Sequence, residues 1–117
     1  MSKKEIFNSL IRSWGDRAGV FEYDGETGYF YLCHTTEGRV QRISDAIHLF
    51  TGDPDFGEHD VNICWDRSER MVGVFIRGQL WAAFDTANGT KYGGNYRPGG
   101  QSNIPSEVYG SFELIRI

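Results

Sequence analysis

The segment Thr51–Asp60, TGDPDFGEHD, holds the densest group of side chains that could do chemistry. Its members are oxygen and imidazole ligands of the kind that bind metals, namely Asp53, Asp55, Glu58, His59 and Asp60. Calcium-binding loops share the D-x-D start of this segment. The fifth position is Gly57, however, and the bidentate Glu that closes such loops is missing. We therefore predict no metal site and interpret the segment as an acidic surface loop.

Neither cysteine is placed for nucleophilic catalysis. Cys33 directly precedes His34, and neighbouring residues on a strand point to opposite faces, so the two cannot pair as thiolate and base. Cys64 lies in another apolar run, where a free thiol packs as a small hydrophobic group. Zinc at a structural site needs four N or S ligands, and none of the sequence patterns supplies them. Glu22 and Asp24 could form a carboxylate pair, but an acidic protein offers such pairs by chance. We expect no catalytic residue, no cofactor and no enzymatic activity.

The glycine-rich segment Lys91–Gln101, KYGGNYRPGGQ, has no Walker pattern and is a weak candidate for a phosphate site. It does carry Tyr92, Tyr96 and Arg97. Tyr and Arg are among the residue types that most often anchor protein interfaces. We name these three as candidate partner-binding residues, and the alternative is a plain flexible loop.

Acidic side chains dominate the middle of the chain. The formal net charge is −4, and between Asp45 and Glu69 there are seven acidic residues and one basic residue, Arg67. Such a surface repels phosphate backbones and attracts basic partners. The segment TGYFYLCH is similar to an aromatic RNA-recognition strand, but the acidic residues before it argue against nucleic-acid binding. The alternative is a solvated face that only aids solubility. The acids that we expect to contact a basic partner are Asp53, Asp55, Glu58 and Asp60.

These candidates must be positioned by local elements, and two of those elements are expected to be helices. Ser2 and Glu5 have the spacing of a capping box, and apolar residues follow at helical intervals, which predicts an amphipathic helix over residues 3–13. Partial alternation in SLIRSW leaves a strand as the alternative. Ser44 can cap a second, short helix. The apolar stripe of that helix would consist of Ile43, Ala46, Ile47 and Phe50.

The other elements are expected to be strands joined by tight turns. The predicted strands are residues 18–23, 28–35, 39–43, 61–65, 72–77, 79–85 and 111–117. The second of these has apolar or aromatic residues on both faces, so it should be central and covered on both sides. Trp65 alternates with polar neighbours and should be buried, and Arg77-Gly78 should form a two-residue hairpin turn. Residues 86–110 are expected to form a long loop.

The predicted fold class is therefore α+β, in a single domain that spans residues 1–117. It would contain one antiparallel sheet of about six to seven strands, an N-terminal helix and one short helix after the third strand. No apolar run has the length of a signal peptide core or a membrane span, so we expect a cytoplasmic protein without membrane contact.

Several stretches resemble one family of small bacterial proteins that is known only as a domain of unknown function. They are VFEYDGETGYFY (Val20–Tyr31), ISDAIHLF (Ile43–Phe50), ICW, MVGVFIRGQLWAAFD (Met71–Asp85) and NYRP (Asn95–Pro98). The chain departs from the family pattern at Tyr23, where an acidic residue is usual, and in a predicted extra strand after Gly110. The resemblance implies a compact cytosolic domain and transfers no activity.

Size, charge and the absence of a catalytic pattern together favour a non-enzymatic protein that recognises another, basic protein. Immunity proteins that neutralise bacterial toxins are often small, acidic and of a single domain, so an immunity or inhibitor role fits this hypothesis. Two alternatives remain open. One is a small-molecule-binding or enzymatic domain with its site beside the long loop, and the other is a homodimer built through a sheet edge.

Overall fold

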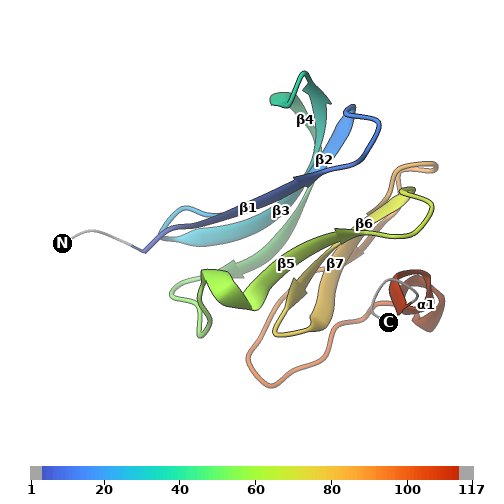
Figure 1. The fold of residues 1–117 in the computed structure, drawn as a ribbon. Helices are drawn as coiled ribbons and strands as arrows, with labels where there is room; N and C mark the ends of the chain where they lie inside the picture. The colour runs from blue at the N-terminus through green and yellow to red at the C-terminus, as the bar shows by residue number, and fades with distance from the viewer. Residues whose placement is uncertain (1–3, 114–117) are drawn as a thin grey trace.

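The computed structural model describes residues 4–113, which form two four-stranded antiparallel sheets. The sheets face each other as the two layers of a sandwich (Figure 1). The first sheet has the order β1-β2-β3-β4 and consists of β1 (Ile6–Ile11), β2 (Arg17–Tyr23), β3 (Thr27–Thr36) and β4 (Arg39–Thr51). The second has the order β5-β6-β7-β8 and consists of β5 (Val61–Trp65), β6 (Met71–Ile76), β7 (Gln79–Asp85) and β8 (Lys91–Gly93). A 3-10 turn, η1 (Glu58–Asp60), precedes β5, and the helix α1 (Ser106–Glu113) follows β8.

The protein is thus mostly β, and the predicted α+β class with a single sheet is wrong. The predicted N-terminal helix over residues 3–13 is also wrong, since residues 6–11 form β1. This strand pairs with β2 along its whole length, from Ile6 opposite Tyr23 to Ile11 opposite Ala18. Pairing satisfies the backbone groups that a helix would have satisfied internally, and it buries Ile6 in the core. Ser2, of the predicted capping box, lies outside the described residues.

The short helix predicted at Ser44 is wrong as well, because β4 continues without interruption to Thr51. Irregular pairing with β3 explains the misleading pattern. Leu32 is opposite Asp45 and Cys33 is opposite Ile43, so Ser44 has no partner in the register and forms a bulge. The bulge changes which residues face the core. Ile43 is 55% exposed, whereas Ile47 is buried, so the two side chains do not share a face as they would in a helix. Their four-residue spacing nevertheless resembles the apolar stripe of a helix.

The C-terminal part also differs from expectation. The predicted final strand, residues 111–117, is helical as far as Glu113, and its remainder lies outside the described residues. The segment 86–110 contains β8 and most of α1, so it is not a single long loop. Apolar side chains of α1 and the segment before it pack on the outer face of the second sheet. This outer cluster consists of Phe75, Leu80, Ala83, Ile104, Val108 and Phe112.

Other predictions are confirmed. The first hairpin is β2 and β3, the strands β5, β6 and β7 lie where alternation placed them, and Trp65 is buried. The two-residue turn between β6 and β7 forms at Arg77-Gly78, with φ angles of 52° and 79°. Strand β3 lies inside its sheet, but only one of its faces is fully covered, because Tyr29 and Tyr31 are half-buried on the outer side.

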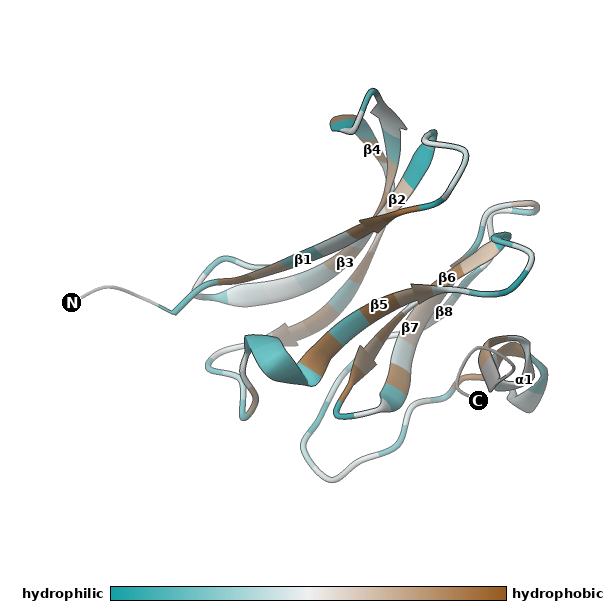
Figure 2. Ribbon diagram, viewed as in Figure 1, coloured by the Kyte–Doolittle hydropathy of each residue, from teal (hydrophilic) through white to brown (hydrophobic). Residues whose placement is uncertain are grey.

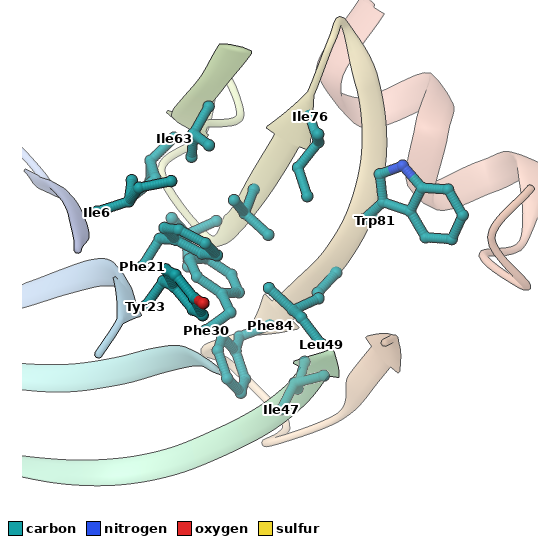
Figure 3. Packing of buried hydrophobic residues seen from close by; sticks show 14 of the residues in the cluster. Ile6, Phe21, Tyr23, Phe30, Ile47, Leu49, Ile63, Ile76, Trp81 and Phe84 are labelled. Atoms are coloured by element: carbon teal, nitrogen blue, oxygen red, sulfur yellow. The ribbon is translucent and has the colours of Figure 1, made fainter. Parts of the chain in front are cut away.

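The main core lies between the sheets and draws on both of them. Figure 3 shows Phe21, Phe30 and Leu49 of the first sheet meeting Ile63, Ile76 and Phe84 of the second. The alternation of apolar and polar residues along β5 is visible in Figure 2. The second sheet is covered twice, by the first sheet and by α1, and this accounts for the nearly continuous apolar sequences of β6 and β7.

Candidate functional site at the acidic end

Two segments bring acidic side chains together at one end of the sandwich. One is the β2–β3 turn at residues 24–26, and the other is the loop 52–60 between β4 and β5. The amide of Gly52 donates to the carbonyl of Glu26 at 2.7 Å, which holds the segments side by side. The 3-10 turn η1 at this end is strongly hydrophilic in Figure 2. We call this region the acidic end, and its acids are Asp24, Glu26, Asp53, Asp55, Glu58 and Asp60.

Three of these acids accept hydrogen bonds from neighbouring residues of this end. The carboxylate of Asp24 accepts hydrogen bonds from the amides of Glu26 and Thr27, each at 2.9 Å, and so closes the β2–β3 turn. Asp60 accepts a hydrogen bond from the amide of Gly57 at 2.9 Å. Asp53 accepts one from the hydroxyl of Tyr23 at 3.3 Å. These hydrogen bonds therefore hold the acidic loop in a defined conformation.

Asp55 is hydrogen-bonded to both Tyr96 and Arg77 at this end. Its Oδ1 accepts a hydrogen bond from the hydroxyl of Tyr96 at 2.6 Å, and its Oδ2 accepts one from Arg77 Nη1 at 3.0 Å. Arg77 also donates to the carbonyl oxygen of Asp55. These contacts hold the pKa of Asp55 below its usual value, with the Tyr96 hydrogen bond as the largest cause. Burial, followed by the contact with Asp55, raises the pKa of Tyr96 to about 12.

Tyr96 is half-buried, so it does not stand out on an exposed loop as the sequence interpretation implied. Its ring packs against Trp81, Phe56 and Phe50, with centroid distances of 4.8, 5.2 and 6.0 Å. The residue therefore seals the core at this end while its hydroxyl reaches Asp55. Arg97 follows it directly in the chain and is exposed.

Of the predicted partner-binding residues, the structure gathers all but one at this end. Tyr92 lies on β8, opposite Ala83, and packs on the outer cluster under α1. Arg77 was missed by the sequence interpretation because its dipeptide signalled only a turn. Trp81 was missed because nothing in its sequence context distinguishes it from an ordinary core residue.

The acidic run from Asp45 to Glu69 does not form one continuous face. Asp45 pairs with Lys91 at 3.1 Å in the middle of β4. Asp66 is buried at the other end of the second sheet, where it accepts hydrogen bonds from the amides of Arg70 and Met71 at 3.0 Å. The acidic end therefore contains only four acids of this run, and Asp24 and Glu26 of the first hairpin join them.

A hollow of about 400 Å³ opens beside the acidic end, between the β6–β7 turn and the segment 96–101. We call it the arginine hollow. Its polar and aromatic lining consists of Arg77, Gln79, Trp81, Tyr96, Arg97 and Gln101. Guanidinium, carboxamide and indole N–H groups are all hydrogen-bond donors, so the lining is suited to an anionic group.

The geometry elsewhere offers little for catalysis. Cys33 packs with Ala18 and Val20, and burial raises the pKa of its thiol, which disfavours the reactive thiolate. His34 points to the opposite face and contacts Arg42, with Nε2 and Nη2 separated by 3.2 Å. Within residues 4–113, no three His, Cys, Asp or Glu side chains are grouped to hold a metal ion. No helix in the described part of the chain is long and apolar enough to cross a membrane.

Comparison with known proteins gives a family but no activity. The profile of the family "Uncharacterized protein conserved in bacteria (DUF2251)" matches residues 4–107. A protein of Haemophilus influenzae, named "Uncharacterized protein", is 37% identical over 104 residues, which cover 80% of this chain and 64% of the relative. The chain thus spans less than two thirds of that relative's length. No solved structure shows a significant match.

Proposed function

The chain belongs to the bacterial family DUF2251, and we propose that it acts as a non-enzymatic protein that binds a basic partner protein through its acidic end. The observation that carries this proposal is the convergence of acidic side chains from two separate segments on one exposed end. Asp24, Glu26, Asp53 and Glu58 are all exposed there. Complementary charge steers association and selects partners of opposite sign.

Two described cations near this end, Arg77 and Lys4, are engaged in contacts within the protein. Arg77 is held by Asp55 and lies 4.0 Å from Asp60, and the ammonium of Lys4 donates to the carbonyl of Phe56 at 2.8 Å. Hydrogen bonds also fix four of the acidic side chains before binding, namely Asp24, Asp53, Asp55 and Asp60. A preorganised surface loses less conformational entropy when it binds.

A toxin that acts on nucleic acid is one partner of the required kind, because a surface that holds phosphates must be basic. An immunity protein would cover such a surface with acidic groups. The proposal therefore includes an inhibitor or immunity role, exercised in the cytoplasm, where the thiols of Cys33 and Cys64 stay reduced.

An affinity pull-down with matched charge variants tests the proposal. The tagged protein is incubated at low salt with lysate of the cells that encode it, and retained proteins are identified by mass spectrometry. We expect one basic protein in stoichiometric amount, released at high salt. The double variant Glu26→Gln/Glu58→Gln, at the acidic end, should retain much less of it.

The control variant is Glu37→Gln/Glu107→Gln, which removes the same charge elsewhere. Glu37 lies in the β3–β4 turn at the opposite end of the first sheet, and Glu107 is exposed on α1. This variant should retain the partner as the wild type does. Equal losses in both variants would show that only net charge matters, and an empty pull-down with the wild type would count against partner binding altogether.

A further inference from the structure

The arginine hollow is built around an irregularity in β7. In the pairing of β6 with β7, Val74 is opposite Ala82 and Phe75 is opposite Leu80, so Trp81 is left without a partner in the register. A bulge of this kind re-aims the side chain of the extra residue. Figure 3 shows the indole of Trp81 projecting away from Phe30 and Phe84, and this side chain lines the hollow.

The neighbouring strand stabilises the bulge. The amide of Gly94 donates to the carbonyl of Trp81 at 2.8 Å. Gly93, with a φ angle of 84°, passes so close that a Cβ there would lie 2.2 Å from the same carbonyl oxygen. The position of Trp81 is therefore set by backbone contacts rather than by its own packing alone.

The indole N–H of Trp81 has no acceptor among the described residues, although the residue is only 2% exposed. The described side chains include no polar atom that is both fully buried and without a hydrogen-bond partner. The N–H is therefore not fully sealed inside the protein, and the hollow is the space that Trp81 lines. A nearly buried donor that faces an open hollow is ready to bind an acceptor from outside the protein.

Arg97 is held at the rim of the hollow by its own turn. The amide of Gly100 donates to the carbonyl of Arg97 at 3.1 Å. The arginine side chain lies across Gly100, where an added Cβ would come within 2.5 Å of its Cγ. One guanidinium nitrogen is 3.4 Å from the carbonyl of Gln101, and the side chain is otherwise exposed.

We propose that the arginine hollow binds a small organic anion, with its carboxylate or phosphate group held by Arg97 and by the indole N–H of Trp81. The carboxamides of Gln79 and Gln101 lie along the same hollow and supply further donors. Its volume falls within the range of small-molecule sites. This binding is tested separately from the proposed partner protein, because its donors Arg97 and Trp81 are distinct from Glu26 and Glu58, the acids that the pull-down varies.

The test is an NMR titration that follows the indole N–H resonances of the three tryptophans. The Trp81 resonance is assigned by elimination, with Trp14→Phe and Trp65→Phe. Inorganic phosphate and benzoate are added separately at constant ionic strength, with chloride as the reference anion. At least one of them should move the Trp81 resonance along a saturable curve, and Arg97→Gln should weaken that binding by about tenfold.

The matched control is Arg67→Gln, in the loop between β5 and β6 at the far end of the second sheet, which should leave the curve unchanged. A response to phosphate alone would identify a phosphoryl ligand, and a response to benzoate alone would identify an organic acid. The proposal is wrong if neither anion gives a saturable shift, if chloride gives the same shift, or if Arg97→Gln binds as the wild type does.

Discussion

At the scale of single residues, the hydrogen bond from Tyr96 to Asp55 is the contact with the clearest consequence for stability. Tyr96→Phe should lower the free energy of unfolding at pH 7 by about 0.5–1.5 kcal/mol, the value of one hydrogen bond with a partly exposed acceptor. The pKa of Tyr96 is raised to about 12 in the fold, whereas an unfolded tyrosine ionises near pH 10. The unfolded chain therefore loses its proton first, and the wild type loses this stability between those pH values.

Phenylalanine does not ionise, so the stability advantage of the wild type over Tyr96→Phe should fall as the pH rises from 10 to 12, and a shift of this size is enough to reverse it. Urea unfolding of both proteins at pH 7 and pH 11 measures this difference in the free energy of unfolding. Burial is the larger cause of the Tyr96 shift, so the control Asp55→Asn should keep most of the alkaline loss. A gap of the same size at both pH values would contradict this account.

At the scale of elements, the β6–β7 hairpin depends on its turn, which also places Arg77 at the rim of the arginine hollow. Both turn residues have positive φ angles, 52° at Arg77 and 79° at Gly78. Gly78→Ala should destabilise the protein by about 1–2 kcal/mol, because a side chain is disfavoured in the left-handed region. Thermal or urea unfolding gives the value.

The helix α1 supplies the matched control for this substitution. Gly110 lies inside α1, and an added Cβ there would meet no atom within 4 Å. Gly110→Ala should stabilise the protein by about 0.5–1 kcal/mol, because alanine loses less backbone entropy in a helix. If the two substitutions had the same sign, the conformation assigned to one of these positions would be wrong.

At the scale of the whole molecule, the two sheets share one core. A substitution that destabilises one sheet should therefore lower the stability of the other as well. Trp65 joins them directly, since it is 6% exposed and its indole donates to the carbonyl of Leu10 on β1 at 3.0 Å. Trp65→Ala should cost about 3–5 kcal/mol. Native-state hydrogen exchange should show the slowest amides of both sheets losing the same free energy of protection.

Trp14 is the control because it is 71% exposed, with the Arg12 guanidinium 4.3 Å from its ring centroid. Trp14→Ala should cost less than about 1 kcal/mol. Loss of protection confined to the second sheet in Trp65→Ala would show that the sheets unfold separately.

Local pattern alone determined the elements whose side chains alternate and whose turns need glycine. These are β2, β3 and β5 to β7, together with the Arg77-Gly78 turn and the burial of Trp65. The acidic composition of the loop 52–60 was equally plain from the sequence. Such features depend on residues a few positions apart, which a sequence shows directly.

Tertiary structure decided the rest, because the deciding contacts join residues far apart in the chain. Residues 6–11 became a strand by pairing with β2, and the bulge at Ser44 kept β4 extended where the apolar spacing imitated a helix. Phe112 became helical against the outer face of the second sheet. The bulge at Trp81 and the contact of Asp55 with Tyr96 and Arg77 arise in the same way, and they decide where the candidate sites lie.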